Sequence, residues 1–316
     1  MSPARTITLT SLAMLAFAGN SLLCRAALRD TSIDAGSFTT VRLIAGAVTL
    51  WLLVRVRGGA AAAGGNWLSA LALLAYAGGF SFAYLRLPAA TGALLLFGAV
   101  QVTMIGYGVW AGERLRRSHV AGLLLAAGGV VGLLLPGLSA PPLLGSSLML
   151  AAGAAWGVYS LRGRGVGDPL TATAGNFLRA ATIAVLVSVV MLSRATRDLS
   201  GVGYAVVSGA VASGIGYSIW YTVLPALRAT TAATVQLAVP ILAAVGGILL
   251  LGEPLTIRLV VAAVAVLGGI ALVVLDTPPP LRAASSPGRD SMHTHARLDA
   301  DSNQRSGEIQ DFHSEV

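Results

Sequence analysis

The sequence has no lysine, a single cysteine (Cys24) and few charged residues, which occupy 11% of its 316 positions. A soluble domain carries about a quarter charged residues, because a packed core needs a polar surface to stay in water. The shortage of charge excludes an ordinary soluble globular fold, and the high apolar content excludes a disordered chain. The single cysteine excludes a disulfide scaffold and a thiolate metal cluster.

Apolar residues make up 55% of the chain, and the mean hydropathy is +0.78. The formal net charge is +8, and all 21 basic residues are arginines. The arginines stand mostly singly or in pairs between apolar runs, which is typical of charges that flank membrane segments and not of a nucleic-acid-binding surface. We therefore expect the lipid bilayer as a partner, and no nucleic acid.

Ten apolar runs have the length that an α-helix needs to cross the ~30 Å hydrocarbon layer. Helices pair all their backbone groups internally, as lipid requires. The sequence thus predicts an all-α integral membrane protein with ten transmembrane helices, at residues 7–23, 37–54, 67–85, 91–110, 120–135, 143–161, 170–192, 203–224, 229–251 and 257–275.

An internal repeat divides these ten helices into two sets of five. Sliding the chain by 137 positions aligns Arg25, Arg42, Gly79, Ser81, Tyr84 and Pro88 with Arg162, Arg179, Gly216, Ser218, Tyr221 and Pro225. Because five is odd, the second set enters the membrane from the opposite side, as in many secondary transporters. We predict inverted repeats at 1–136 and 137–276, followed by a disordered cytoplasmic tail at 277–316, where Pro278 to Pro280 stop the last helix.

The distribution of arginine predicts the orientation. With the N-terminus inside, eleven arginines fall in inner segments and six in outer ones. This bias favours cytoplasmic N- and C-termini in a multi-pass protein of a cell membrane, the inner membrane of a bacterium.

Several ordered motifs resemble those of one known family. They are Phe38 to Arg42, Gly112 to Leu115, Ala155 to Ser160, Gly216 to Tyr221, Gln236 to Pro240 and Leu251 to Pro254. The chain from about residue 12 to 275 is similar to the EamA-type transporters of the drug/metabolite transporter superfamily. This resemblance implies two five-helix repeats and substrates such as amino acids, related metabolites or drugs. Where the family often has a proline in the fourth helix, this chain has Val100, next to Gln101.

Arg42 and Arg179 are the only charges well inside the predicted helices. A charge at membrane depth is costly and usually has a partner or a water-filled path. A lone guanidinium suits a cavity that receives an anionic group, because it offers a planar fork of donors. The alternative is that both arginines reach the interface or bond to carbonyls as structural supports.

Neutral polar and aromatic residues form a second group of candidates. Aromatic rings with a polar tip suit the binding of small amphipathic molecules, although Trp and Tyr near helix ends also form interfacial belts. The candidates for the substrate pathway are Asn20, Tyr84, Gln101, Trp156, Tyr159, Asn176, Tyr217, Trp220, Tyr221 and Gln236.

Glu113, Glu253 and Pro240 are candidates for a helix-end or gating role. Each glutamate follows a glycine at the water boundary, which is typical either of a helix end or of a gate, and a proline removes a helix hydrogen bond. Paired glycines such as Gly268-Gly269 let membrane helices approach closely.

The sequence predicts a secondary-active transporter, an exporter or exchanger of small organic metabolites, and not an enzyme. It has neither a phosphate-binding glycine loop with Lys nor a Ser, Asp and His set that resembles a catalytic triad, so we expect no cofactor and no metal. Two alternatives remain open: a receptor or assembly factor of the membrane that does not transport, and a flippase for lipid-linked sugars. We expect a monomer or a homodimer, with a small-molecule substrate as its partner.

Overall fold

The structure is a computed structural model that describes residues 1–60, 64–112, 116–137, 140–163, 166–196, 198–227 and 235–275. Glu113 and the predicted disordered tail lie outside these residues. All regular structure in the described ranges is helical. One compact unit contains the described residues.

Eight helical segments are long and apolar enough to cross a membrane, and two shorter apolar helices complete a set of ten in the described part of the chain. In chain order they are α1 (Pro3–Asp30), α2 (Ala35–Val56), α3 (Trp67–Tyr84), α4 (Ala89–Trp110), α5 (Arg117–Leu134), α6 (Leu143–Arg162), α7 (Pro169–Val190), the continuous run α8 (Leu199–Val207), η3 (Ser208–Ile215), α9 (Gly216–Val223) and η4 (Leu224–Ala226), then α11 (Ala238–Leu251) and α12 (Ile257–Leu275).

Each predicted apolar run is found in this set, but some helices end elsewhere because polar caps, not hydropathy, set the ends. The first helix extends beyond the predicted 7–23, since the Ser2 side chain accepts a hydrogen bond from Arg5 N and the chain leaves the helix at Thr31. Asp34 and Asp168 cap α2 and α7 in the same way. The predicted run at 229–251 is described from residue 235, and its helix α11 begins at Ala238.

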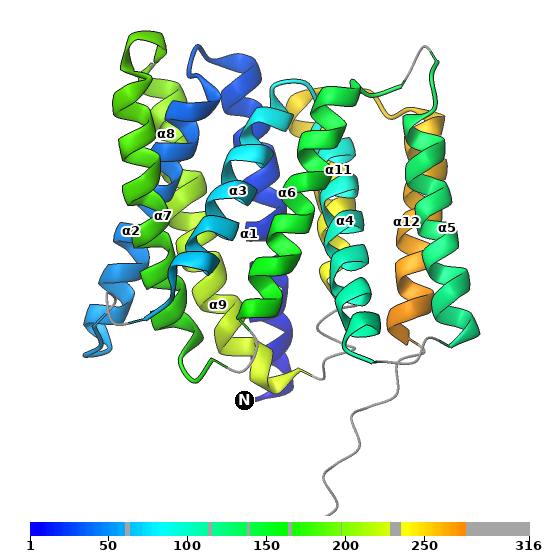
Figure 1. The fold of residues 1–316 in the computed structure, drawn as a ribbon, viewed down its shortest axis with the longest axis horizontal. Helices are drawn as coiled ribbons and strands as arrows, with labels where there is room; N and C mark the ends of the chain where they lie inside the picture. Colours follow the sequence, from blue (N-terminus) through cyan, green and yellow to red (C-terminus); the bar gives the residue numbers. More distant parts are fainter. Residues whose placement is uncertain are drawn as a thin grey trace, which may run out of the picture. The chain divides into compact units, whose positions relative to one another are not determined.

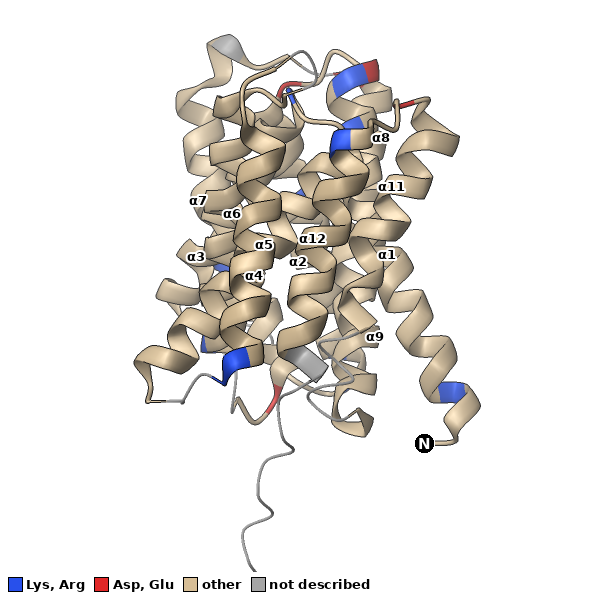
Figure 2. Ribbon diagram, turned by 90° about the vertical axis from the view of Figure 1, so that its right-hand side faces the viewer, with Lys and Arg blue, Asp and Glu red and all other residues tan. Residues whose placement is uncertain are grey.

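The helices run up and down, so that consecutive connections alternate between two faces (Figure 1). We call the face that holds the N-terminus and the α6–α7 connection the N-terminal face, and the other, which holds the α1–α2 connection, the Thr31 face. Charged residues gather near these two faces, and the band between them is almost free of charge (Figure 2). This distribution is what a bundle surrounded by lipid requires.

Helices from distant parts of the sequence pack against one another. The main pairs are α5 with α12, α3 and α4 with α6, and α2 with α7 and η3. Small residues permit this approach: a Cβ on Gly209 would meet the Arg42 carbonyl oxygen, and a Cβ on Gly153 would lie 2.6 Å from the Ala99 Cβ.

The eighth span contains a feature that hydropathy did not predict. Its central segment η3 is a π-helix of 8 residues, between the α-helices α8 and α9. A π-helical turn widens the helix and is frequent at functional sites. Here it brings Ala212 and Ser213 to the cavity described next.

Candidate functional site

A cavity of about 440 Å³ lies between the helices of the bundle. This volume is in the range of small-molecule sites. Residues from both halves of the chain line it, on α1, α3, α4, α6, η3 and α9. Eight of them belong to the predicted pathway: Asn20, Gln101, Trp156, Tyr159, Tyr217, Trp220, Tyr221 and Gln236.

Aromatic rings in mutual contact form much of the cavity wall. Trp156 stacks on Tyr217, with centroids 5.4 Å apart and an interplanar angle of 20°, and on Tyr159 at 5.3 Å and 29°. Tyr76 lies 4.8 Å from the Trp156 ring, and Phe17 lies 5.6 Å from the Tyr217 ring. The wall therefore presents flat apolar surfaces with phenol groups among them, which suits a ring-bearing amphipathic molecule.

The polar side chains at the wall are neutral. Asn20 Nδ2 donates to Tyr76 Oη at 3.1 Å, and Ser208 Oγ donates to Asn20 Oδ1 at 2.7 Å. These bonds join α1, α3 and the π-helical segment at one point. None of the described residues that line the cavity is charged, and no cluster of three or more His, Cys, Asp or Glu side chains is found in the described ranges.

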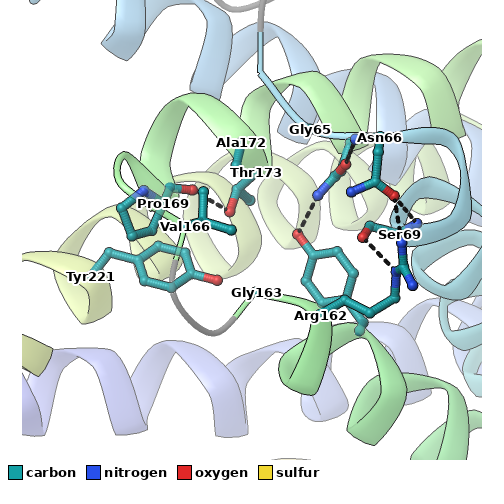
Figure 3. A pocket seen from close by; sticks show the side chains of 12 residues that line it. Gly65, Asn66, Ser69, Arg162, Gly163, Val166, Pro169, Ala172, Thr173 and Tyr221 are labelled. Atoms are coloured by element: carbon teal, nitrogen blue, oxygen red, sulfur yellow. Dashed lines mark hydrogen bonds between the residues drawn. The ribbon is translucent and has the colours of Figure 1, made fainter.

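A smaller cavity of about 240 Å³ adjoins the first and shares five lining residues with it: Tyr159, Gly163, Val166, Pro169 and Tyr221 (Figure 3). Asn176 lines this smaller cavity, where its Oδ1 accepts a hydrogen bond from Asn66 N at 2.8 Å. Its wall also includes Arg162, which donates to Ser69 Oγ and Asn66 Oδ1, both at 3.1 Å. Val166 is 38% exposed, so the two cavities reach the N-terminal face at the α6–α7 connection.

The other three candidates on the predicted pathway lie outside the lining of both cavities. Tyr84 is fully buried behind the wall, with its ring 4.7 Å from that of Phe80. Arg42 is 2% exposed, and its guanidinium lies over the rings of Tyr76 and Phe80. Arg179 Nη1 donates to the carbonyl oxygens of Gly64, at 2.7 Å, and Gly175, at 2.9 Å. These bonds attach the segment before α3 to α7.

Glu253 lies at the Thr31 face, where it joins three parts of the chain. Its Oε1 accepts a hydrogen bond from Arg25 Nε at 3.0 Å, and its Oε2 accepts one from Ala89 N at 2.7 Å, at the start of α4. Arg25 Nη1 also donates to Tyr84 O at 2.8 Å. We call these contacts the Glu253 latch. Gly252 makes it possible, because its left-handed backbone (φ 62°) ends α11 and turns Glu253 inward.

Pro240 lies in the first turn of α11 and is buried, where a missing N–H costs little. Sequence reasoning did not select several residues that the fold brings to the two cavities: Phe17, Phe80, Phe97, Met104, Ser213, Asn66, Ser69 and Arg162. The sequence spacing could have selected Phe80, since it follows Tyr76 by four positions and so shares its helix face. No sequence feature could have selected Ser213, because the π-helix determines the direction of its side chain.

Ten apolar helices in the described ranges, with an aromatic cavity between them, indicate a multi-pass membrane protein. Comparison with known proteins specifies the class. The EamA-like transporter family matches residues 143–275. The chain is 58% identical over 274 residues to an uncharacterized protein of Pseudomonas aeruginosa, covering 86% of this chain and 96% of the relative. It is 31% identical over 169 residues to an uncharacterized transporter of Archaeoglobus fulgidus, covering 51% and 59%.

The chain belongs to the EamA-like transporter family, and hence to the drug/metabolite transporter superfamily. It is a membrane transporter, and members of this family are transporters rather than enzymes. A crystal structure of another protein has the same fold, with a TM-score of 0.61 and 20% identity, covering 87% of this chain and 99% of that one.

Proposed function

We propose that this protein is a secondary-active carrier that exports or exchanges small organic metabolites, such as amino acids or drugs, by alternating access. The observation that carries the proposal is the asymmetry of the cavity. It reaches the N-terminal face at Val166, whereas the Glu253 latch and the fully buried Tyr84 and Leu87 close the bundle toward the Thr31 face. A cavity accessible from one side at a time is the basis of alternating access.

The arginine bias supports an orientation in which the N-terminal face is cytoplasmic. In that orientation the cavity loads from the cytoplasm, and release outward requires the Glu253 latch to open. The sequence offset of 137 supports an inverted repeat of residues 1–136 and 137–276 as the source of the two access states.

The lining also bears on the energy source. No described cavity residue is a carboxylate, so a proton-driven cycle would have to use a group outside the cavity or the substrate itself. This favours exchange, in which the gradient of one organic solute drives the transport of another, over coupling to protons.

Counterflow in proteoliposomes tests the proposal. Vesicles loaded with an unlabelled aromatic solute, such as 3-phenylpropionate, should accumulate the labelled solute transiently, with a saturable rate. Protein-free vesicles are the control for passive leak. Saturable binding to the protein without any counterflow would support a receptor instead and would reject the carrier.

A further inference from the structure

Arg42 carries a positive charge directly behind the cavity wall. Its guanidinium carbon lies 5.0 Å from the centroid of the Phe80 ring and 5.5 Å from that of Tyr76. Both rings line the larger cavity, whereas Arg42 itself does not. The guanidinium is therefore next to two rings of the cavity wall without being part of the lining itself.

This charge lacks the compensation that a buried cation normally has. Arg42 is 2% exposed, and its Nη1 has no hydrogen-bond acceptor among the described residues. No ion pair joins Arg42 to a carboxylate of the described residues, and Glu253 is already paired with Arg25. Arginine does not lose its proton in proteins, and ring contacts offset only part of the cost of burying a charge.

Arg179 provides the internal comparison, since the repeat aligns it with Arg42. Arg179 Nη1 has two carbonyl acceptors, at 2.7 and 2.9 Å, as expected of a structural support. Equivalent positions in the two halves thus hold one satisfied guanidinium and one that is not. A buried charge without a hydrogen-bond partner lowers the stability of the protein, and proteins retain such charges mainly at functional sites.

Resting on the proposed carrier function, we propose that Arg42 sets the charge selectivity of the cavity: it favours ring-bearing organic carboxylates over neutral and cationic molecules of the same shape. The aromatic wall holds the ring of the solute. The positive potential of Arg42 acts through Phe80 and Tyr76 on the carboxylate, in a cavity whose described lining has no charge of its own.

The expected size of the effect follows from the geometry. A carboxylate on the cavity side of the Phe80 ring lies about 8.5 Å from the guanidinium, because the guanidinium is 5.0 Å from the ring centroid and one van der Waals spacing adds ~3.5 Å. At an effective dielectric constant of about 20, this attraction changes the dissociation constant by roughly thirty-fold. Repulsion of a cation at the same place has the same magnitude.

Three probes with one skeleton test the proposal: 3-phenylpropionate, its neutral amide and 3-phenylpropylammonium. Their dissociation constants are measured on the full-length protein in detergent by calorimetry, together with the melting temperature. The wild type should bind the carboxylate at least tenfold more tightly than the amide, and the ammonium more weakly than the amide. Equal affinity for carboxylate and amide, or no binding of any probe at millimolar concentration, overturns the proposal.

Substitutions assign the preference to Arg42. Arg42→Met should reduce the carboxylate-to-amide ratio to about one, leave amide affinity within threefold and keep or raise the melting temperature. Arg42→Lys should retain most of the preference because the charge remains. Arg55→Met is the matched control: Arg55 is an exposed arginine on the same helix, stacked on Trp51 at 5.5 Å, and its loss should change nothing.

The outcomes separate this proposal from the carrier function. An Arg42→Met protein that melts earlier or does not fold, or that loses all three probes equally, identifies Arg42 as a structural support and overturns the proposal. Saturable counterflow without charge preference also overturns the selectivity proposal, but it supports the carrier function. Charge-selective binding that depends on Arg42, with no flux, upholds the selectivity role and rejects the carrier.

Discussion

The contact between α5 and α12 depends on glycines at which the two helix backbones touch. A Cβ on Gly269 would meet the Gly122 carbonyl oxygen and would lie 2.8 Å from Ala126 N, whereas a Cβ on Gly268 would meet nothing within 4 Å. The two neighbouring glycines thus form a matched pair. One faces the partner helix, and the other faces away from it.

Alanine at Gly269 should therefore destabilise the protein, and alanine at Gly268 should not. Overpacking of a tight contact costs about 1–3 kcal/mol, because backbone atoms have to move. Alanine in open space instead gains up to about 0.5–1 kcal/mol, because glycine has more backbone freedom to lose. The free energies of unfolding of the two variants should differ by roughly 1.5–4 kcal/mol.

Unfolding in mixed micelles with increasing SDS, followed by near-ultraviolet circular dichroism, measures the difference. Gly122→Ala, on the other side of the contact, should behave like Gly269→Ala. Gly128→Ala should behave like Gly268→Ala, because its Cβ also meets nothing within 4 Å. Equal stability of Gly269→Ala and Gly268→Ala would show that the helices do not pack through these glycines.

Three further predictions concern the ends of the helices. Glu253→Ala removes the Glu253 latch and should raise the rate at which a maleimide labels the buried Cys24 at least fivefold. Glu253→Gln should give a smaller rise, because its amide oxygen still accepts a hydrogen bond from Ala89 N. An unchanged labelling rate would refute the role of the latch. The hydrogen bond from the Thr171 side chain and the backbone N–H groups at the start of α7 lower the pKa of Asp168, so its contribution to stability is present above its unfolded pKa of about 3.9 and is lost as the pH falls through the folded value. The difference in melting temperature between wild type and Asp168→Asn should therefore be present at pH 7 and shrink below pH 4. A difference that stays constant with pH contradicts this prediction. An imposed pH gradient should drive little flux in the wild type; strong drive that survives Glu113→Gln combined with Glu253→Gln would mean that the titrating group lies elsewhere.

The sequence predicts the number and positions of the spans well, because the cost of leaving apolar length or unpaired backbone in lipid is large. It selects Trp156 and Tyr217 as candidates for the substrate pathway, and both line the larger cavity, where their rings stack. Hydropathy does not predict the π-helix at Ser208–Ile215, because it depends on residue types and not on the spacing of the backbone hydrogen bonds that distinguishes a π-helix from an α-helix.

The two intramembrane arginines show where sequence reasoning ends. The predicted repeat aligns Arg42 with Arg179, and both lie inside predicted helices, so sequence reasoning treats them alike. Their surroundings differ because the carbonyl oxygens of Gly64 and Gly175 accept hydrogen bonds from Arg179, whereas Nη1 of Arg42 has no acceptor among the described residues. The Gly64 carbonyl lies 115 positions from Arg179 in the sequence, and the rings at Arg42 belong to a different helix, so these contacts are visible only in the folded chain.

The most direct test of the carrier is to fill the cavity and measure flux. Ala212 lines the cavity and is 3% exposed, whereas its neighbour Val211 is 48% exposed and lies outside the lining. Ala212→Trp should abolish saturable counterflow of 3-phenylpropionate, and Val211→Trp should retain it, when both are compared at equal amounts of folded protein. Undiminished counterflow through folded Ala212→Trp protein would contradict transport through this cavity.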